Sequence, residues 1–287
     1  MQASEFRAQP GTLYVVATPI GNLRDITLRA LDILKSVDLV AAEDTRTTGG
    51  LLSAYGIQAK LFASHEHNER TAAAALVERL REGKSVALVS DAGTPGISDP
   101  GAVAVRAVRE AGFPVVPLPG ASAVATALSA AGLAGDWQFH GFLPHKAGER
   151  RRELAALAAL PHSLVFYESP HRLLDTVADL AAGFGGGRRL FIARELTKRF
   201  ESFHECLLSE ALDWLQADDN RQRGEFVLVV SGRPAAADTG LDEARRVLEI
   251  LLDDLPASQA ARLAARITGM KKNALYDLAQ ILKKDAE

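Results

Sequence analysis

Short apolar runs alternate along the chain with longer segments whose apolar residues recur every three or four positions. The short runs predict buried strands, and the longer segments predict amphipathic helices. In the first half of the chain, strands are expected at 13–18, 37–42, 86–90 and 115–118, and helices at 26–36, 45–55, 68–82, 102–111 and up to about Gly132. Strands that are apolar throughout and joined by helices are typical of a parallel sheet covered on both faces.

The second half of the chain continues this alternation and then changes character. Strands are expected at 139–143, 164–167, 190–195, 200–207 and 225–230, the last three at least partly antiparallel, and helices at 148–160 and 170–182. Residues 233–240 have the composition of a linker, and three helices are expected after it, at 241–252, 258–267 and 272–283. Asn68 or Thr71 and Ser258 are the expected N-caps of two helices, and Gly269 is an expected helix end.

This pattern predicts an α/β protein with three parts. They are an N-terminal α/β domain (1–135), a second α/β domain (136–233) and a small C-terminal helical domain (241–287) that resembles a helix-turn-helix unit.

Composition excludes several classes of protein. The 287 residues are 47% hydrophobic and 24% charged, which is ordinary for a globular chain with a core and excludes a disordered or coiled-coil protein. One cysteine, Cys206, excludes an internal disulfide and a cysteine-based zinc site. The first ten residues have no apolar core segment typical of a signal peptide, and prolines and glycines interrupt the uncharged run 111–135. We therefore expect a cytoplasmic protein with no membrane partner.

Charge is balanced overall but not locally. A net charge of −3 gives the molecule as a whole no electrostatic attraction to nucleic acid, and DNA is not an expected partner. Residues 241–256 carry a net charge of −3, whereas residues 257–287 hold six Lys/Arg against three Asp/Glu, a net charge of +3. The basic residues Arg262, Arg266, Lys271 and Lys272 therefore predict contact with nucleic-acid phosphates, although the same helices would also suit a packing or dimerisation module. Lys146 and Arg150, at a helix start with Arg151 and Arg152, also predict phosphate contact, and their alternative interpretation is a solvated helix face.

Three expected strands end in loops rich in glycine and proline, at 18–22, 91–101 and 119–122. Ligands of parallel α/β sheets bind beyond the carboxyl ends of the strands, and glycine allows the backbone to approach a ligand closely. Tight turns alone have the same composition, but three such loops together favour a binding site. Neither a G-x-G-x-x-G after the first strand nor a G-x-x-x-x-G-K-[ST] is present, which argues against a standard dinucleotide site and a phosphate-binding NTPase loop.

The order of these motifs resembles that of a known family. The segments that carry the resemblance are Leu13–Asp25, Ala42–Arg46, Ser90–Gly101, Pro119–Ser122, Phe166–Arg172 and Arg194–Lys198. They are similar to the tetrapyrrole-methylase superfamily and, within it, to the bacterial 16S ribosomal RNA cytidine 2′-O-methyltransferases. The sequence departs from the superfamily's glycine-aspartate-proline signature at Gly93-Thr94-Pro95, where a hydroxyl replaces a carboxylate.

The resemblance implies two α/β domains with an S-adenosylmethionine cleft between them. It places the methionine part of the cofactor near Pro19, Ala92, Gly93, Thr94 and Ile97. Further cofactor contacts are implied at Asp91, Gly120, Ala121, Ser122, Ala123, Tyr167, Glu168 and Glu195.

The implied reaction is methylation of a ribose 2′-hydroxyl, at cytidine-1402 of 16S ribosomal RNA. The 30S subunit is the expected partner, and a homodimer is the expected assembly, with weak support from the Ala-rich segment 122–133. A small-molecule tetrapyrrole methylase with the same fold and cofactor is the alternative. No metal is expected, because His65 and His67 would face one way on a strand without a third or fourth ligand.

Proton removal from the ribose hydroxyl requires a base near the cleft. Glu43, Asp44 and Arg46 follow the second strand and are the expected catalytic group, with a proton acceptor among the carboxylates and a phosphate contact at Arg46. Glu43→Gln or Asp44→Asn is expected to slow turnover by about 10²–10⁴-fold, whereas Arg46→Ala is expected to weaken RNA binding and lower its salt dependence. Asp44 or Thr45 would equally suit a helix N-cap, and a residue can be both a cap and a base. If Asp44 serves as a cap alone, Glu168 or Glu195 is the alternative base. Asn22 and Arg24 are the expected substrate contacts on the first loop.

Overall fold

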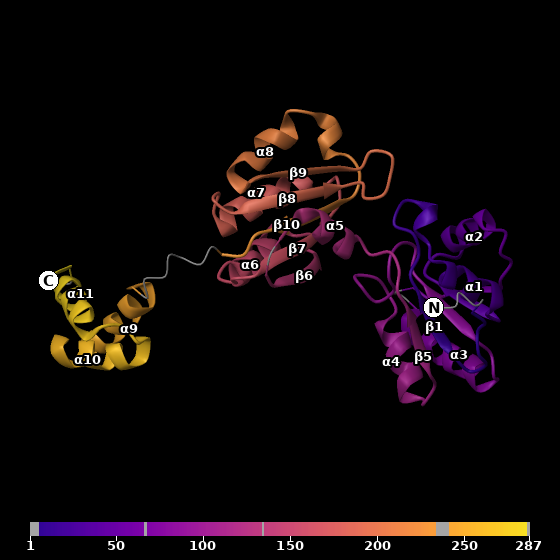
Figure 1. Cartoon of the computed structure of the whole chain (residues 1–287), viewed down its shortest axis with the longest axis horizontal. Helices are drawn as coiled ribbons and strands as arrows, with labels where there is room; N and C mark the ends of the chain where they lie inside the picture. The colour runs from indigo at the N-terminus through magenta and orange to yellow at the C-terminus, as the bar shows by residue number, and fades with distance from the viewer. Residues whose placement is uncertain (1–5, 66–67, 134, 234–240, 286–287) are drawn as a thin grey trace. The chain divides into compact units, whose positions relative to one another are not determined.

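A computed structural model describes residues 6–65, 68–133, 135–233 and 241–285. The chain divides into two compact units, residues 1–232 and 233–287. The larger unit contains two five-stranded sheets, and the smaller unit contains three helices (Figure 1). The predicted α/β class with a C-terminal helical part is confirmed.

The first sheet is entirely parallel, with strand order β3-β2-β4-β1-β5. Its strands are β1 (Leu13–Val16), β2 (Leu39–Ala42), β3 (Leu61–Ala63), β4 (Val86–Val89) and β5 (Val115–Leu118). The connecting helices are α1 (Leu28–Ser36), α2 (Thr45–Ala54), α3 (Glu69–Arg81) and α4 (Ala102–Glu110), with a short 3₁₀ turn η1 (Leu23–Asp25) before α1. Two apolar clusters cover the sheet, one built with α1 and the other with α3 and α4. Both faces are therefore buried, as the continuous apolar strands predict.

The second sheet is mixed, with order β6-β7-β10-β8-β9. Its strands are β6 (Trp137–Phe142), β7 (Ser163–Glu168), β8 (Arg189–Arg194), β9 (Ser202–Leu207) and β10 (Phe226–Val230). Only β6 and β7 pair in parallel, and the other three pairings are antiparallel. The helices of this region are α5 (Ala123–Ala131), α6 (Ala147–Leu157), α7 (Leu173–Phe184) and α8 (Leu208–Gln216), followed by a 3₁₀ turn η3 (Asp219–Gln222). One face packs on α6, α7 and α8, and α5 covers the other.

Helix α5 precedes the second sheet in sequence but packs against it. Val124 and Ala127 are buried with Val165, Phe191 and Val227 of that sheet. The apolar side of the Ala-rich segment 122–133 is therefore used in the core. The homodimer prediction consequently rests on the family resemblance alone.

The C-terminal unit consists of α9 (Leu241–Asp254), α10 (Ala257–Thr268) and α11 (Lys272–Asp285) around an alanine-rich core. Gly269 ends α10 in the left-handed conformation, as predicted, because glycine adopts a positive φ without a Cβ clash. The predicted N-cap Ser258 is wrong: the helix begins one residue earlier, with Pro256 at the cap position. Asn68 occupies the N-cap position of α3, but its side chain accepts from the amide of His65 instead of capping the helix.

No described helix is long and apolar enough to cross a membrane. The uncharged run 111–135 forms β5, a turn and α5 instead.

Candidate functional site

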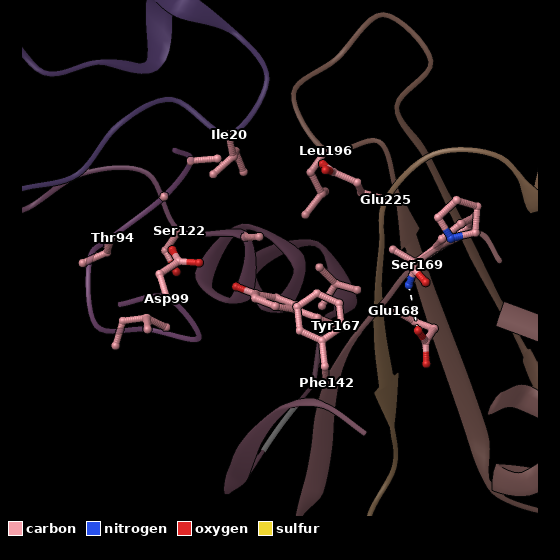
Figure 2. A pocket seen from close by; sticks show the side chains of 17 residues that line it. Ile20, Thr94, Asp99, Ser122, Phe142, Tyr167, Glu168, Ser169, Leu196 and Glu225 are labelled. Carbon is pink, nitrogen blue, oxygen red and sulfur yellow. Dashed lines mark hydrogen bonds between the residues drawn. The ribbon is translucent and has the colours of Figure 1, made fainter. Parts of the chain in front are cut away.

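A cavity of about 360 Å³ lies in the larger unit, where the loops after β1, β4 and β5 meet the second sheet (Figure 2). It is lined by Ile20, Ala92, Gly93, Thr94, Ile97, Asp99, Ser122, Ala123, Phe142, Tyr167, Glu168, Ser169, Pro170, Leu196, Glu225, Phe226 and Val227. The three glycine- and proline-containing loops thus converge at the carboxyl edge of the first sheet, where their sequence predicts a ligand.

Backbone and hydroxyl hydrogen bonds join these loops to one another. Thr18 and Gly93 exchange both backbone hydrogen bonds, at 2.8 and 3.0 Å. The Thr94 hydroxyl donates to the carbonyl of Ala121 at 3.0 Å. The hydroxyl at position 94, where the superfamily has a carboxylate, therefore links the second and third loops.

A glycine is required at two points of this loop cluster. Gly93 has φ of +85°, which is strained for any residue with a Cβ. A Cβ on Gly120 would lie 2.6 Å from the Cβ of Ala17, so the third loop can approach the end of β1 only without a side chain.

Eight of the predicted cofactor residues line the cavity: Ala92, Gly93, Thr94, Ile97, Ser122, Ala123, Tyr167 and Glu168. The other five, Pro19, Asp91, Gly120, Ala121 and Glu195, do not line it. The carbonyl of Ala121 accepts the hydrogen bond from the Thr94 hydroxyl, so Ala121 helps to hold a residue that does line the cavity. Glu195 has φ of +51° and accepts from Lys198 Nζ at 2.9 Å and from the amide of Glu225 at 3.0 Å. Although burial opposes ionisation of Glu195, these contacts hold its pKa below the usual value.

The charged side chains that line the cavity are all acidic: Asp99, Glu168 and Glu225. Glu168 is fully buried; its carboxylate accepts from the Thr176 hydroxyl at 2.6 Å and from the amide of Ser169 at 2.8 Å. Burial also raises the pKa of Tyr167 to about 12, so its hydroxyl stays neutral at physiological pH. Arg172 pairs with Glu168 at 3.5 Å and Lys198 with Glu225 at 2.7 Å, so Asp99 is the lining carboxylate without an ion pair among the described residues. The cavity is therefore apolar with a local negative charge, a combination that suits a cationic ligand.

The predicted catalytic group lies beside the cavity but does not line it. Asp44 is the N-cap of α2, where its side chain accepts from the Arg46 amide at 2.7 Å. The Arg46 guanidinium donates to the same carboxylate at 3.1 and 2.6 Å, and its hydrogen bond lowers the pKa of Asp44 to about 2. Glu43 accepts from the Asp91 amide at 3.3 Å, and burial raises its pKa. The structure thus shows Asp44 as the helix cap, a role that is compatible with a catalytic one, and the catalytic role stays a prediction.

We therefore expect Asp44→Ala to lower the melting temperature, whereas Asp44→Asn should keep most of the stability, because asparagine is an equally good N-cap. Both variants should turn over within about tenfold of the wild type, well short of the ~10²–10⁴-fold loss typical of a missing general base. Thermal unfolding and single-turnover methylation measured on both variants check this. A hundredfold slower Asp44→Asn protein with an unchanged melting temperature would instead make Asp44 the base.

The predicted RNA contacts have different surroundings. The prediction that Arg150 contacts an RNA phosphate is wrong. Its side chain is 5% exposed and donates from Nε to Asp179 at 2.7 Å, so it cannot reach a phosphate. Although burial opposes ionisation of Asp179, Arg151 and Arg150 hold its pKa below the usual value. Lys146 is exposed and pairs with Glu149 at 3.2 Å.

The remaining predicted contacts are exposed. Asn22 and Arg24 lie on the first loop, where Asn22 caps η1 by accepting from the Arg24 amide. In the C-terminal unit, Arg262, Arg266, Lys271 and Lys272 are exposed and make no ion pair with any residue that the structure describes. They remain predicted phosphate contacts.

The metal prediction falls partly on residues outside the described structure. Glu66 and His67 are not described, and the described residues contain no group of three or more His, Cys, Asp or Glu side chains able to hold a metal ion.

Several lining residues were not predicted from sequence. Ile20 and Asp99 belong to the glycine- and proline-containing loops, so their position in the motif was the available signal. Phe142, Leu196 and Glu225 come from the second sheet and its loops, and only the antiparallel pairing of β8 and β10 brings the last two to the cavity.

Comparison with known proteins gives the family. Residues 12–212 match the model of Tetrapyrrole (Corrin/Porphyrin) Methylases, and residues 238–283 match the RsmI C-terminal HTH domain. Among solved structures, the methyltransferase CobJ aligns with a TM-score of 0.58 and 20% identity, covering 77% of this chain and 94% of that chain. A uroporphyrin-III C-methyltransferase from Thermus thermophilus, complexed with S-adenosyl homocysteine, aligns with a TM-score of 0.55 and 17% identity, covering 77% and 97%. Residues 12–212 thus have the fold of a tetrapyrrole methylase.

Curated relatives are much more similar. Ribosomal RNA small subunit methyltransferase I of Escherichia coli O157:H7 is 54% identical over 270 residues, covering 94% of each chain. The protein of the same name from Neisseria meningitidis serogroup A is 55% identical over 271 residues, covering 94% of this chain and 93% of its own. The chain therefore belongs to the ribosomal RNA small subunit methyltransferase I family of tetrapyrrole methylases. Family membership confirms S-adenosylmethionine as the cofactor.

Proposed function

We propose that this protein methylates the 2′-hydroxyl of cytidine-1402 in 16S ribosomal RNA, within the 30S subunit and in the cytoplasm. The observation that carries the proposal is the 54% identity, over 94% of both chains, to a protein named for ribosomal RNA methylation. The exposed basic residues of α10 and the start of α11 support a polyanionic substrate, since a small-molecule methylase has no need of them.

The cavity fits the cofactor chemically. S-adenosylmethionine carries a sulfonium and an ammonium group against one carboxylate, and the cavity presents carboxylates among apolar side chains, with no Lys, Arg or His in its described lining. Gly93, Thr94 and Ala123 would hold it through backbone groups and a hydroxyl, and Tyr167 would supply an aromatic wall. When bound, the cofactor supplies an electrophilic methyl group on sulfur.

The chain's own residues then have three tasks. The linked loops hold the two reactants in line, which contributes much of the acceleration of such a displacement. The apolar walls, including Phe142 and Leu196, limit water at the reacting atoms. A carboxylate removes the proton from the ribose oxygen.

Methylation of isolated ribosomal subunits with labelled cofactor tests this proposal. We expect label in 16S RNA at one cytidine, in a product that resists alkaline cleavage because its 2′ oxygen is blocked. Assembled 30S subunits and free 16S RNA are compared in parallel. Transfer to a corrin or porphyrin with none to RNA would instead support the small-molecule alternative.

We also propose that the enzyme is a homodimer, on the strength of the family resemblance. Light scattering at working concentration should give twice the chain mass of 30.7 kDa. A monomer mass throughout the concentration range would reject it.

A further inference from the structure

The loop between β8 and β9 borders the cavity and then carries an aromatic ring into solvent. Strand β8 ends at the same edge of the second sheet as β7, whose last residues line the cavity. Two residues after β8, Leu196 lines the cavity at the same end as Ile20 of the first loop (Figure 2). Four residues further along, Phe200 is 63% exposed. Because four residues span at most about 14 Å, the Phe200 backbone lies within that distance of the cavity wall.

The β8–β9 loop is fixed by its surroundings, although its backbone is strained. Glu195 and Thr197 have φ of +51° and +64°, which is uncommon for residues with a Cβ. The amides of Lys198 and Glu201 donate to the carbonyls of Glu195 and Lys198 at 3.0 and 3.1 Å. A Cβ on Gly21 would overlap the side chain of Lys198, so the loop also packs closely on the first loop. Backbone strain that the surroundings hold in place is typical of functional sites.

One guanidinium ties Phe200 to a neighbouring segment. Arg194 donates from Nη1 to the Phe200 carbonyl at 3.1 Å and from Nε to the Arg223 carbonyl at 2.6 Å. The Arg199 guanidinium lies 5.6 Å from the centre of the Phe200 ring. Arg199 and Arg223 are exposed, and neither makes an ion pair with a described residue. Arg199, Phe200 and Arg223, called the Phe200 cluster below, thus combine an exposed ring with two unpaired cations.

The acidic side chains around the Phe200 cluster are already bound. Lys198 Nζ donates to Glu195 at 2.9 Å and to Glu225 at 2.7 Å, and Glu201 accepts from the amide of Thr197. A symmetric contact with a second copy of the chain would bring the same unpaired arginines together. Single-stranded RNA instead supplies both missing partners, since bases stack on aromatic rings and arginine planes, and phosphates bind arginines.

We propose that the Phe200 cluster binds an unpaired nucleotide next to the one that is methylated, an inference that rests on the proposed function. The base of this nucleotide stacks on the Phe200 ring, and Arg199 and Arg223 contact the adjoining phosphates. The cluster would hold the strand while the neighbouring ribose enters the cavity. The enzyme would then bind RNA at the cavity rim as well as through its C-terminal helices, and it would need a single-stranded segment there.

The test uses the full-length protein with 30S subunits under single-turnover conditions, at several subunit concentrations. Phe200→Ala should raise the half-saturating subunit concentration by about 5–150-fold, the cost of one lost base stack. Its rate at saturation should stay within about threefold of the wild type, because the ring aids binding alone. Phe200→Trp should keep the wild-type affinity, whereas Phe200→Leu, which has no aromatic face, should resemble Phe200→Ala. Calorimetric affinity for S-adenosylhomocysteine should be unchanged in all three, because Phe200 does not line the cavity.

Salt dependence separates the ring from the arginines. Arg199→Ala and Arg223→Ala should each lower the slope of log affinity against log salt by about 0.7, the value for a single strand, and Phe200→Ala should leave the slope unchanged. Phe6→Ala is the matched control. Phe6 is 39% exposed, and the Arg29 guanidinium lies 4.9 Å from its ring. It precedes β1, at the amino edge of the first sheet, so this variant should match the wild type throughout.

The possible failures are distinguishable. Wild-type protein that leaves ribosomal RNA unmethylated overturns the proposed function. Wild-type methylation with an unchanged half-saturating concentration in Phe200→Ala overturns the role of the Phe200 cluster alone. An equal loss of affinity in Phe200→Trp and Phe200→Ala would also overturn it, because the ring would then be a packing residue of the loop. A lower mass for Phe200→Ala than for the wild type in light scattering would make the cluster an interface between copies instead.

Discussion

A chain that ends at Arg233 should bind S-adenosylhomocysteine as the full-length protein does and should no longer methylate ribosomal RNA. The cavity is lined only by residues of the larger unit, which ends at Gly232. The last strand of that unit, β10, is buried along its whole length, and the Ser231 amide is bonded to the carbonyl of Arg189. The truncation therefore leaves the cofactor site complete and removes the basic helices.

A milder variant tests the reason for this loss. Replacing Arg262, Arg266, Lys271 and Lys272 with alanine keeps the three-helix core, since all four side chains are exposed. Each lost phosphate contact should reduce the slope of log affinity against log salt by about 0.7–0.9, and RNA affinity should fall while calorimetric cofactor binding is unchanged. Normal methylation of 30S subunits by the truncated chain would show that the C-terminal unit is not needed for substrate binding.

The position of the cofactor site could be predicted because its signal is local. Glycines and prolines in the segments 18–22, 91–101 and 119–122 mark loops at strand ends, and the parallel order of strands brings such ends to one edge of the sheet. Strand β3 was missed because only three residues, Leu61–Ala63, form it. Helix α8 was missed because it follows β9 without an intervening turn that would mark a helix start, and no element was assigned to residues 208–224.

The roles of individual charged residues could not be predicted, because they depend on partners distant in sequence. Arg150 has the local sequence of a solvated basic face, and only the packing of α7 places Asp179 against it. Asp44 and Asp99 both follow strands of one sheet. The first is bound by Arg46, only two residues away, and its cap position is among the sequence-based expectations, whereas the pKa of the second is set by burial and by the charges of Glu43 and Asp91, which the sequence pattern does not show.

Gly93→Trp should abolish binding of S-adenosylhomocysteine while the protein stays folded. Gly93 lines the cavity, and a Cβ at this position would point into a space bounded by Ile20 Cγ2 at 3.6 Å and the Ala121 carbonyl at 4.0 Å. An indole extending from it would occupy volume that the cofactor needs. The backbone hydrogen bonds between Gly93 and Thr18 use main-chain atoms alone, so the substitution does not remove them. Calorimetry with S-adenosylhomocysteine is the direct measurement.

Strain at a positive φ must be separated from the filling of the cavity, and Gly112 offers the matched control. Its φ of +82° is close to the +85° of Gly93, and nothing lies within 4 Å of a Cβ built on it. It precedes β5, at the amino edge of the sheet, whereas the cavity lies at the carboxyl edge. Gly112→Trp should therefore show a similar loss of unfolding free energy from backbone strain, of about 1–2 kcal/mol, but normal cofactor binding. Binding by Gly93→Trp as tight as by Gly112→Trp would place the cofactor outside this cavity, and equal loss in both would mean that strain alone prevents binding.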